Sequence, residues 1–157
     1  MTQAPSSFPS PERERFLVEA RSVLSERADV AAAYLYGSAA RGRTTPLSDI
    51  DLAILPVEGL SESARAMLQR HLVNRLGAIG GSESVSVDVR FFDELPLAIR
   101  GRILREGVLV IDRDLVLRVR AEVRSRMEYH DFQQFERAGT EQWVRAVRER
   151  RKVTEGG

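Results

Sequence analysis

Two aspartates separated by one residue begin the apolar run DIDLAILP at 49–56. Alternate residues of a strand point to the same face, so Asp49 and Asp51 would leave one face about 6 to 7 Å apart along the backbone. Like charges held this close repel each other and raise each other's pKa unless a counter-charge is present. The pair therefore raises the question of which cation it binds.

A third carboxylate lies on the polar face of a later alternating segment, SVSVDVRFF at 84–92. If this strand pairs with the strand at 49–56, Asp88 would lie beside the first two aspartates. Asp93 and Glu94 are alternative third acids, although both fall at the end of the segment. Strand parity favours Asp88.

The absence of cysteine and the presence of only two histidines restrict the ligands of such a site to oxygen. Oxygen ligands favour a hard cation, and Mg²⁺ is usually held by one or two carboxylates together with substrate phosphates. We therefore expect Mg²⁺ with a nucleoside triphosphate. Two ions roughly 4 Å apart could bind the attacking and leaving oxygens of a phosphoryl displacement.

The pair Gly37-Ser38 follows the apolar run at 30–36 and would supply the phosphate side of this site. Glycine lets the backbone approach phosphate oxygens closely, and a short helix after it would direct free N–H groups at them. Ser38 adds a hydroxyl donor, and Arg41 and Arg43 can supply positive charge. A P-loop is excluded because GSAARGRTT lacks the Gly-Lys-Ser/Thr ending.

The full segment GSAARGRTTPLSDIDLAI places ten residues between Ser38 and Asp49. It resembles the signature of the polymerase-beta-like nucleotidyltransferase superfamily in its minimal form, and the resemblance covers roughly 30–111. The resemblance implies nucleotidyl transfer, usually of AMP from ATP. The residues that we assign to the nucleotide are Gly37, Ser38, Arg41 and Ser48.

The same resemblance implies that Asp49 and Asp51 bind Mg²⁺, which we expect as two ions, and that Asp88 is the third acid. Asp88 would help to activate the attacking hydroxyl and join the metal ligands.

A narrower resemblance covers LPLAIRGRILREGVLVIDRD and the later YHDF. These segments are similar to the MntA family of adenylyltransferase antitoxins, which implies a hetero-oligomer with a HEPN ribonuclease toxin. AMP would be transferred to a toxin tyrosine, and the C-terminal helical region would contact the toxin. Two alternatives stay open: a small-molecule adenylyltransferase that modifies antibiotics, and an antitoxin that masks its toxin by binding alone.

Apolar periodicity predicts the elements that position these residues. Helical spacing occurs at 11–28, 61–79 and 95–107, and again from 114 to about 150. Strand patterns occur at 30–36, 49–56, 84–92 and 108–111. In the last helical region one stripe carries Val116, Val119, Val123 and Met127. We predict an α/β (α+β) fold with a small mixed β-sheet, helices mainly on one face and a C-terminal helical extension.

The length of 157 residues fits one domain. We expect a disordered lead-in at 1–10, a nucleotidyltransferase core at 11–112, a C-terminal extension at 113–151 and a flexible tail at 152–157. At least one of Tyr34 and Tyr36 should belong to the core, and self-modification of a tyrosine has no support in the sequence.

The net charge of +1 provides no strong nucleic-acid signal. No apolar run approaches the roughly 20 residues needed to span a bilayer. We therefore expect no membrane association and a cytoplasmic location.

Overall fold

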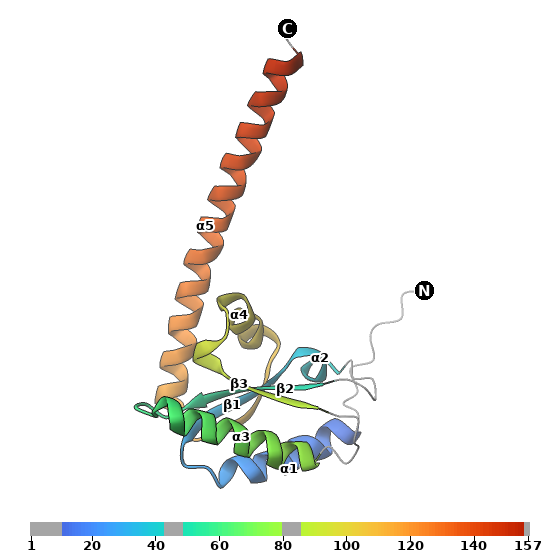
Figure 1. The fold of residues 1–157 in the computed structure, drawn as a ribbon, viewed down its shortest axis with the longest axis vertical. Coiled ribbons are helices and arrows are strands. Elements are labelled where there is room, and N and C mark those ends of the chain that lie inside the picture. The colour runs from blue at the N-terminus through green and yellow to red at the C-terminus, as the bar shows by residue number, and fades with distance from the viewer. Residues whose placement is uncertain (1–10, 43–48, 80–85, 156–157) are drawn as a thin grey trace.

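The structure is a computed structural model that describes residues 11–42, 49–79 and 86–155, without the side chains at 12 and 146–155. Figure 1 shows a small sheet between helices and one long helix that extends away from it. The strands are β1 (Val30–Tyr36), β2 (Ile50–Pro56), β3 (Val87–Phe91) and β4 (Val108–Asp112). The helices are α1 (Pro11–Ser25), α2 (Gly37–Ala40), α3 (Glu62–Ile79), α4 (Leu97–Glu106) and α5 (Leu115–Glu155), and a 3-10 turn, η1, covers Phe92–Glu94.

The four strands form one mixed sheet in the order β3-β2-β1-β4. β1 pairs antiparallel with β2 and with β4, whereas β2 and β3 are parallel. The carboxyl end of β1 therefore meets the amino ends of β2 and β3. This edge of the sheet carries the glycine–serine turn and the aspartates, and the mixed α/β fold predicted from the sequence is confirmed.

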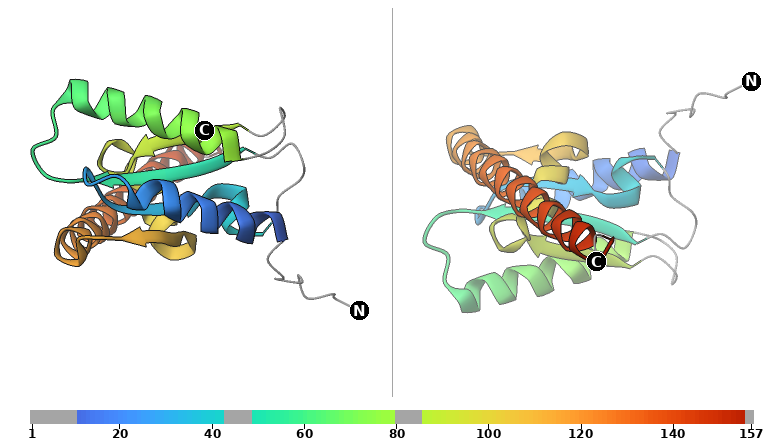
Figure 2. Two further views of the ribbon diagram at one scale, coloured as in Figure 1. Left: turned by 90° about the horizontal axis from the view of Figure 1, so that it is seen from below. Right: turned by 90° about the horizontal axis from the view of Figure 1, so that it is seen from above.

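Helices α1 and α3 lie side by side across one face of the sheet (Figure 2). Their apolar residues pack on the strand residues that point toward them, including Leu35, Leu52 and Ile54, which are almost fully buried. In the second half of β2 the opposite face is also apolar, since Ala53 and Leu55 belong to a second buried hydrophobic cluster. Burial of both faces explains why the run after Asp51 contains no further polar residue.

Helix α4 and the first turns of α5 pack on this second face, where Phe92 and Ile103 contact the sheet. The rings of Tyr34 and Phe92 lie 5.6 Å apart between centroids. These elements cover the half of the face that is remote from the aspartates. Tyr36 and Asp51, nearer the edge, stay half-buried.

The C-terminal region is a single continuous helix of 41 residues, and only its first turns contact the domain (Figure 1). Its inner side carries Leu117 and Ala121 against the sheet and a buried Ser125. The predicted apolar stripe lies on the outer side and is 43 to 66% exposed at Val116, Val119, Val123 and Met127. The helix continues to Glu155, into the segment that we expected as a tail. The division of the chain at 112 and 151 stays a prediction.

Polar contacts attach the start of α5 to the sheet. The hydroxyl of Tyr34 donates to Glu122 at 2.7 Å, and Arg118 pairs with Asp112 at 2.9 Å and with Glu122 at 2.7 Å. Burial and the Glu122 carboxylate raise the pKa of Tyr34. In the described ranges, no helix combines the length and apolar character needed to cross a membrane.

Candidate active site

A row of three polar residues crosses three strands at the open edge of the second face. Asp51 on β2 is the register partner of Tyr36 on β1 and of Asp88 on β3. Residues directly opposite each other in neighbouring strands point to the same face. Asp51 and Asp88 therefore lie side by side, as strand parity predicts.

The two alternative third acids are placed elsewhere. Asp93 and Glu94 belong to η1, and both accept hydrogen bonds from Arg65 of α3, at 2.8 to 3.0 Å. The Arg65 guanidinium also lies over the ring of Phe91, 5.1 Å from its centroid. Phe91 packs on the face covered by α1 and α3, so the Arg65 cluster is on the opposite side of the sheet from Asp51.

Gly37 brings the backbone of the turn against the carboxylate of Asp51. Its φ of +71° lies in the left-handed region, which non-glycine residues rarely adopt. A Cβ atom at this position would overlap Oδ2 of Asp51. The short helix α2 starts at Gly37, and Ser38 in its first turn is half-buried. Glycine is therefore required at 37 both by conformation and by space.

Asp49 immediately precedes β2 and is exposed. Its Oδ1 accepts a hydrogen bond from the Ser86 hydroxyl at 2.5 Å, and the backbone of the same serine accepts from the N–H of Ile50 at 2.9 Å. These two bonds tie the start of β2 to the start of β3. Ser48 and Arg43 lie outside the described residues.

Burial and neighbouring acids shift the pKa values of two residues in this row, Asp51 and Tyr36. Burial, followed by the charges of Asp88 and Asp49, raises the pKa of Asp51, and Arg90 opposes this effect. Burial and the charges of Asp51 and Asp88 raise the pKa of Tyr36 to about 12. The Tyr36 hydroxyl therefore stays protonated at neutral pH beside the acids.

Tyr36 was not predicted from the sequence as a residue of the site. The signal was present, since Tyr36 directly precedes Gly37, but its position opposite Asp51 depends on the register of β1 with β2.

Two arginines near the expected site already have acidic partners. Arg90 donates to Asp88 at 2.8 Å, whereas Arg41, expected at the nucleotide, pairs with Glu106 at the end of α4 at 3.3 Å. The structure thus brings Gly37, Asp51 and Asp88 together but engages Arg41 with another element.

The donor set fits Mg²⁺ in kind, because the site offers carboxylate oxygens whose mutual repulsion a divalent cation would relieve. It is not assembled as a three-ligand site: within 11–42, 49–79 and 86–155, no three acidic or histidine side chains are grouped closely enough to hold an ion. Asp49 instead accepts a hydrogen bond from Ser86, and Asp88 accepts one from Arg90.

Comparisons with known proteins agree with the fold. Residues 19–115, more than half of the chain, match the family described as Polymerase beta, Nucleotidyltransferase. No curated protein sequence matches the chain significantly.

Solved structures with a similar fold include three toxin-antitoxin structures. A toxin-antitoxin crystallised with AMP-PNP is 19% identical, covers 83% of this chain and 98% of its own, and superposes with a TM-score of 0.59. An MntA-HepT toxin-antitoxin is 17% identical over 81% of this chain and 97% of its own, with a TM-score of 0.54. A complex of the tri-AMPylated Shewanella oneidensis HEPN toxin with its MNT antitoxin is 16% identical, covers 82% and 98%, and has a TM-score of 0.56.

These likenesses concern the fold, which this chain shares with the solved MNT antitoxins. The family match spans β1, α2, β2 and β3, the elements that hold Gly37, Asp51 and Asp88. The chain belongs to the polymerase beta nucleotidyltransferase family.

Proposed function

We propose that this protein is an antitoxin that transfers AMP from ATP, in the presence of Mg²⁺, to a tyrosine hydroxyl of a partner HEPN ribonuclease toxin. The family match supports nucleotidyl transfer. The similar solved structures, which include an AMP-PNP complex and an AMPylated HEPN toxin, support the nucleotide and the partner. The exposed outer side of α5 is where we expect the toxin to bind.

The observation that carries the proposal is the meeting of Gly37, Asp51 and Asp88 at one edge of the sheet. The backbone of Gly37, which has no side chain, lies against Asp51. Asp88 lies directly opposite Asp51 in the parallel strand pair. Such an arrangement can place a phosphate chain beside carboxylates that bind a cation. The proposed metal ligands are Asp49, Asp51 and Asp88.

In the proposed reaction the tyrosine oxygen attacks the α-phosphorus of ATP and forms a new P–O bond. The bond from the α-phosphorus to the oxygen that bridges to the β-phosphate breaks, and pyrophosphate leaves. Asp88 accepts the tyrosine proton. Mg²⁺, when bound, neutralises charge on the phosphates and the attacking oxygen.

The other residues position the nucleotide. The Gly37 turn and the Ser38 hydroxyl would contact the triphosphate, with Ser48 as a further candidate. Arg41 could add positive charge only after leaving Glu106, a surface ion pair that costs little to break. Catalysis would rest mainly on positioning and charge neutralisation.

The test begins with the neighbouring reading frame, where a HEPN ribonuclease is expected, and is mass spectrometry of that partner after incubation with ATP and Mg²⁺. We expect the toxin to gain the mass of one or more AMP units. The double variant Asp49→Ala and Asp51→Ala should abolish the gain and stay folded by circular dichroism, because it removes crowded like charges.

Other outcomes identify the alternatives. Silencing of the toxin in a stable complex, without added mass, would contradict transfer and indicate masking by binding. Full transfer by the double variant would contradict the metal assignment. Modification of an aminoglycoside or lincosamide antibiotic, with an unmodified toxin, would indicate the small-molecule enzyme.

A further inference from the structure

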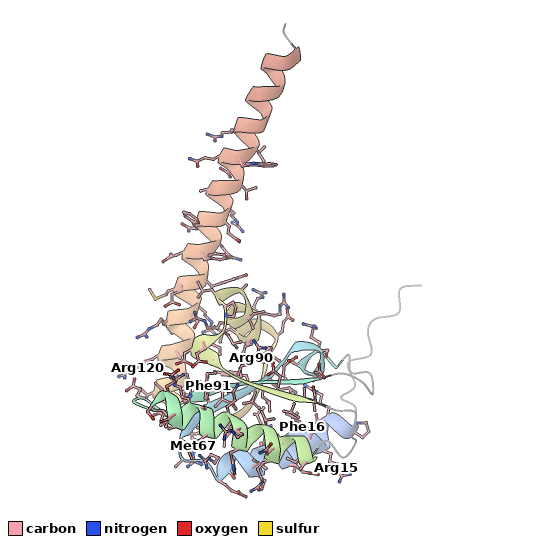
Figure 3. All side chains as sticks on the ribbon, viewed as in Figure 1. Arg15, Phe16, Met67, Arg90, Phe91 and Arg120 are labelled. Atoms are coloured by element: carbon pink, nitrogen blue, oxygen red, sulfur yellow. The ribbon has the colours of Figure 1, made fainter. Side chains whose placement is uncertain are left out.

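An arginine occupies the edge of the acidic row where the third metal ligand is expected. Arg90 lies two residues after Asp88 on the same face of β3, and its Nε donates to Oδ2 of Asp88 at 2.8 Å. In Figure 3 its side chain is drawn on the α4 side of the sheet, away from Met67 of α3. The pair is solvent-accessible, with side chains 60% and 42% exposed.

Nothing else in the described part of the chain takes up the guanidinium through a hydrogen bond. The residue opposite Arg90 on β2 is Ala53, which has no polar side chain, and the nearest acid of β2 is Asp51, beside Asp88. The charge of Arg90 therefore acts on the acidic row: it offsets part of the repulsion among Asp51, Asp88 and Asp49.

We propose that Arg90 is a positioning residue of the nucleotide–metal site, a resident counter-ion that holds Asp88 until Mg²⁺ and nucleotide displace it. The inference rests on the proposed function, since it concerns the same metal site. A carboxylate that is bound to a guanidinium binds a second cation more weakly. The contact between Arg90 and Asp88 therefore competes with metal binding at Asp88. Among the residues that the structure describes, the lack of a three-ligand group would then follow from this ion pair.

Competition has a measurable consequence for the affinity of the site. Removing Arg90 should make metal binding tighter, because the carboxylate becomes free and one positive charge leaves the neighbourhood of the ion. Exposed ion pairs and charges at this range change an equilibrium by about three- to tenfold. A residue that instead contacted the phosphates would have the opposite effect when removed.

The probe is Mn²⁺, which replaces Mg²⁺ at oxygen sites and is followed by electron paramagnetic resonance. Its dissociation constant is measured with a non-hydrolysable ATP analogue and without toxin. We expect Arg90→Gln to bind Mn²⁺ about three- to tenfold more tightly than the wild type. Arg90→Lys, which keeps the charge but loses the planar fork, should lie between the two.

A matched control is Arg75→Gln. Arg75 lies on α3, pairs with Glu26 at 3.5 Å and is 48% exposed, so this variant also removes one arginine from an exposed ion pair. It lies on the helix that covers the opposite face. The Mn²⁺ affinity of Arg75→Gln should equal that of the wild type within experimental error.

Thermal melting supplies a second readout that needs no activity. Without metal, Arg90→Gln leaves Asp51 and Asp88 without their counter-ion, so its melting temperature should fall further than that of Arg75→Gln. Mg²⁺ with nucleotide should then raise the melting temperature of Arg90→Gln by more than that of the wild type. If Arg90→Gln does not fold, Arg90→Thr, a neutral residue suited to strands, repeats both measurements.

Equal Mn²⁺ affinity in the wild type and Arg90→Gln would overturn the inference, and so would weaker binding by Arg90→Gln. Both results leave the proposed function intact, because the wild type still binds the metal. A wild type that binds no Mn²⁺ with the nucleotide analogue would instead contradict the proposed metal site and, with it, this inference.

Discussion

The Asp51 carboxylate occupies the space into which a side chain at Gly37 would project. Gly37 and Asp51, the first acid within β2, are therefore packed against each other, although thirteen residues lie between them in the sequence. A substitution at either position affects both the phosphate side and the metal side of the proposed site.

The first prediction concerns Gly37→Ala. The left-handed φ costs about 1 to 2 kcal/mol for a non-glycine residue, and the new Cβ also collides with Asp51. We expect a loss of stability larger than this cost, measured by urea denaturation, and loss of ATP binding.

The control for Gly37→Ala is Gly59→Ala. Gly59 has a similar φ of +77°, but nothing lies within 4 Å of its added Cβ. It should therefore show only the conformational cost and normal ATP binding. Equal losses in the two variants would mean that the contact with Asp51 has no effect.

The second prediction distinguishes the candidate third acids. Asp88→Asn should lower the rate of AMP transfer by about 100-fold or more, because it removes the proposed proton acceptor and a metal ligand. Asp93→Asn should keep a near-normal rate, because Asp93 pairs with Arg65 on the other side of the sheet. Rates are measured by mass spectrometry of the toxin. A comparable loss of rate in both variants would contradict the choice of Asp88 over Asp93 as the third acid.

The third prediction concerns the pH dependence of stability without metal. Burial and neighbouring acids raise the pKa of Asp51 in the folded state, so the folded chain keeps this proton to higher pH than the unfolded chain, whose carboxyl titrates near about 3.9. Above that pH the folded state binds more protons, and its stability falls as pH rises through the folded-state pKa.

Asp51→Asn cannot ionise and should escape this loss. In the presence of EDTA its melting temperature should exceed that of the wild type at pH 7, and the difference should shrink toward pH 4. A wild type that is the more stable protein at pH 7 would contradict the sign. Asp93→Asn serves as the control, because its carboxylate has a cationic partner.

The fourth prediction concerns the attachment of α5. Glu122 is 12% exposed and accepts hydrogen bonds from Tyr34 and Arg118, both at 2.7 Å. Glu122→Ala leaves these two groups without their acceptor and should reduce the free energy of unfolding by about 2 to 4 kcal/mol in a denaturant titration.

Arg126→Ala is the matched control for Glu122→Ala. Arg126 contacts the same carboxylate at 3.4 Å but is 58% exposed, so its removal should cost less than about 0.5 kcal/mol. A loss at Arg126 as large as that at Glu122 would indicate that the outer ion pair, rather than the buried contacts, attaches the helix.

Local patterns in the sequence were sufficient to predict the strands and most of the helices. Alternation has a period of two and helical spacing a period of 3.6, so both are visible within a few residues. The same alternation predicted, without knowledge of the neighbouring strands, that Asp49 and Asp51 share one face. In the structure Asp51 lies within β2, and Asp49 immediately precedes it. Gly37, the first residue of α2, was likewise recognised from its position at the end of an apolar run.

Tertiary structure alone decided which residues from different elements meet. The parallel register of β2 and β3 puts Asp88 beside Asp51, and the register of β1 puts Tyr36 on the other side. Packing of α5 through Leu117 leaves the apolar side at Val119 exposed. Strand register and helix orientation depend on contacts between segments far apart in the chain, and a pattern within one segment carries no information about them.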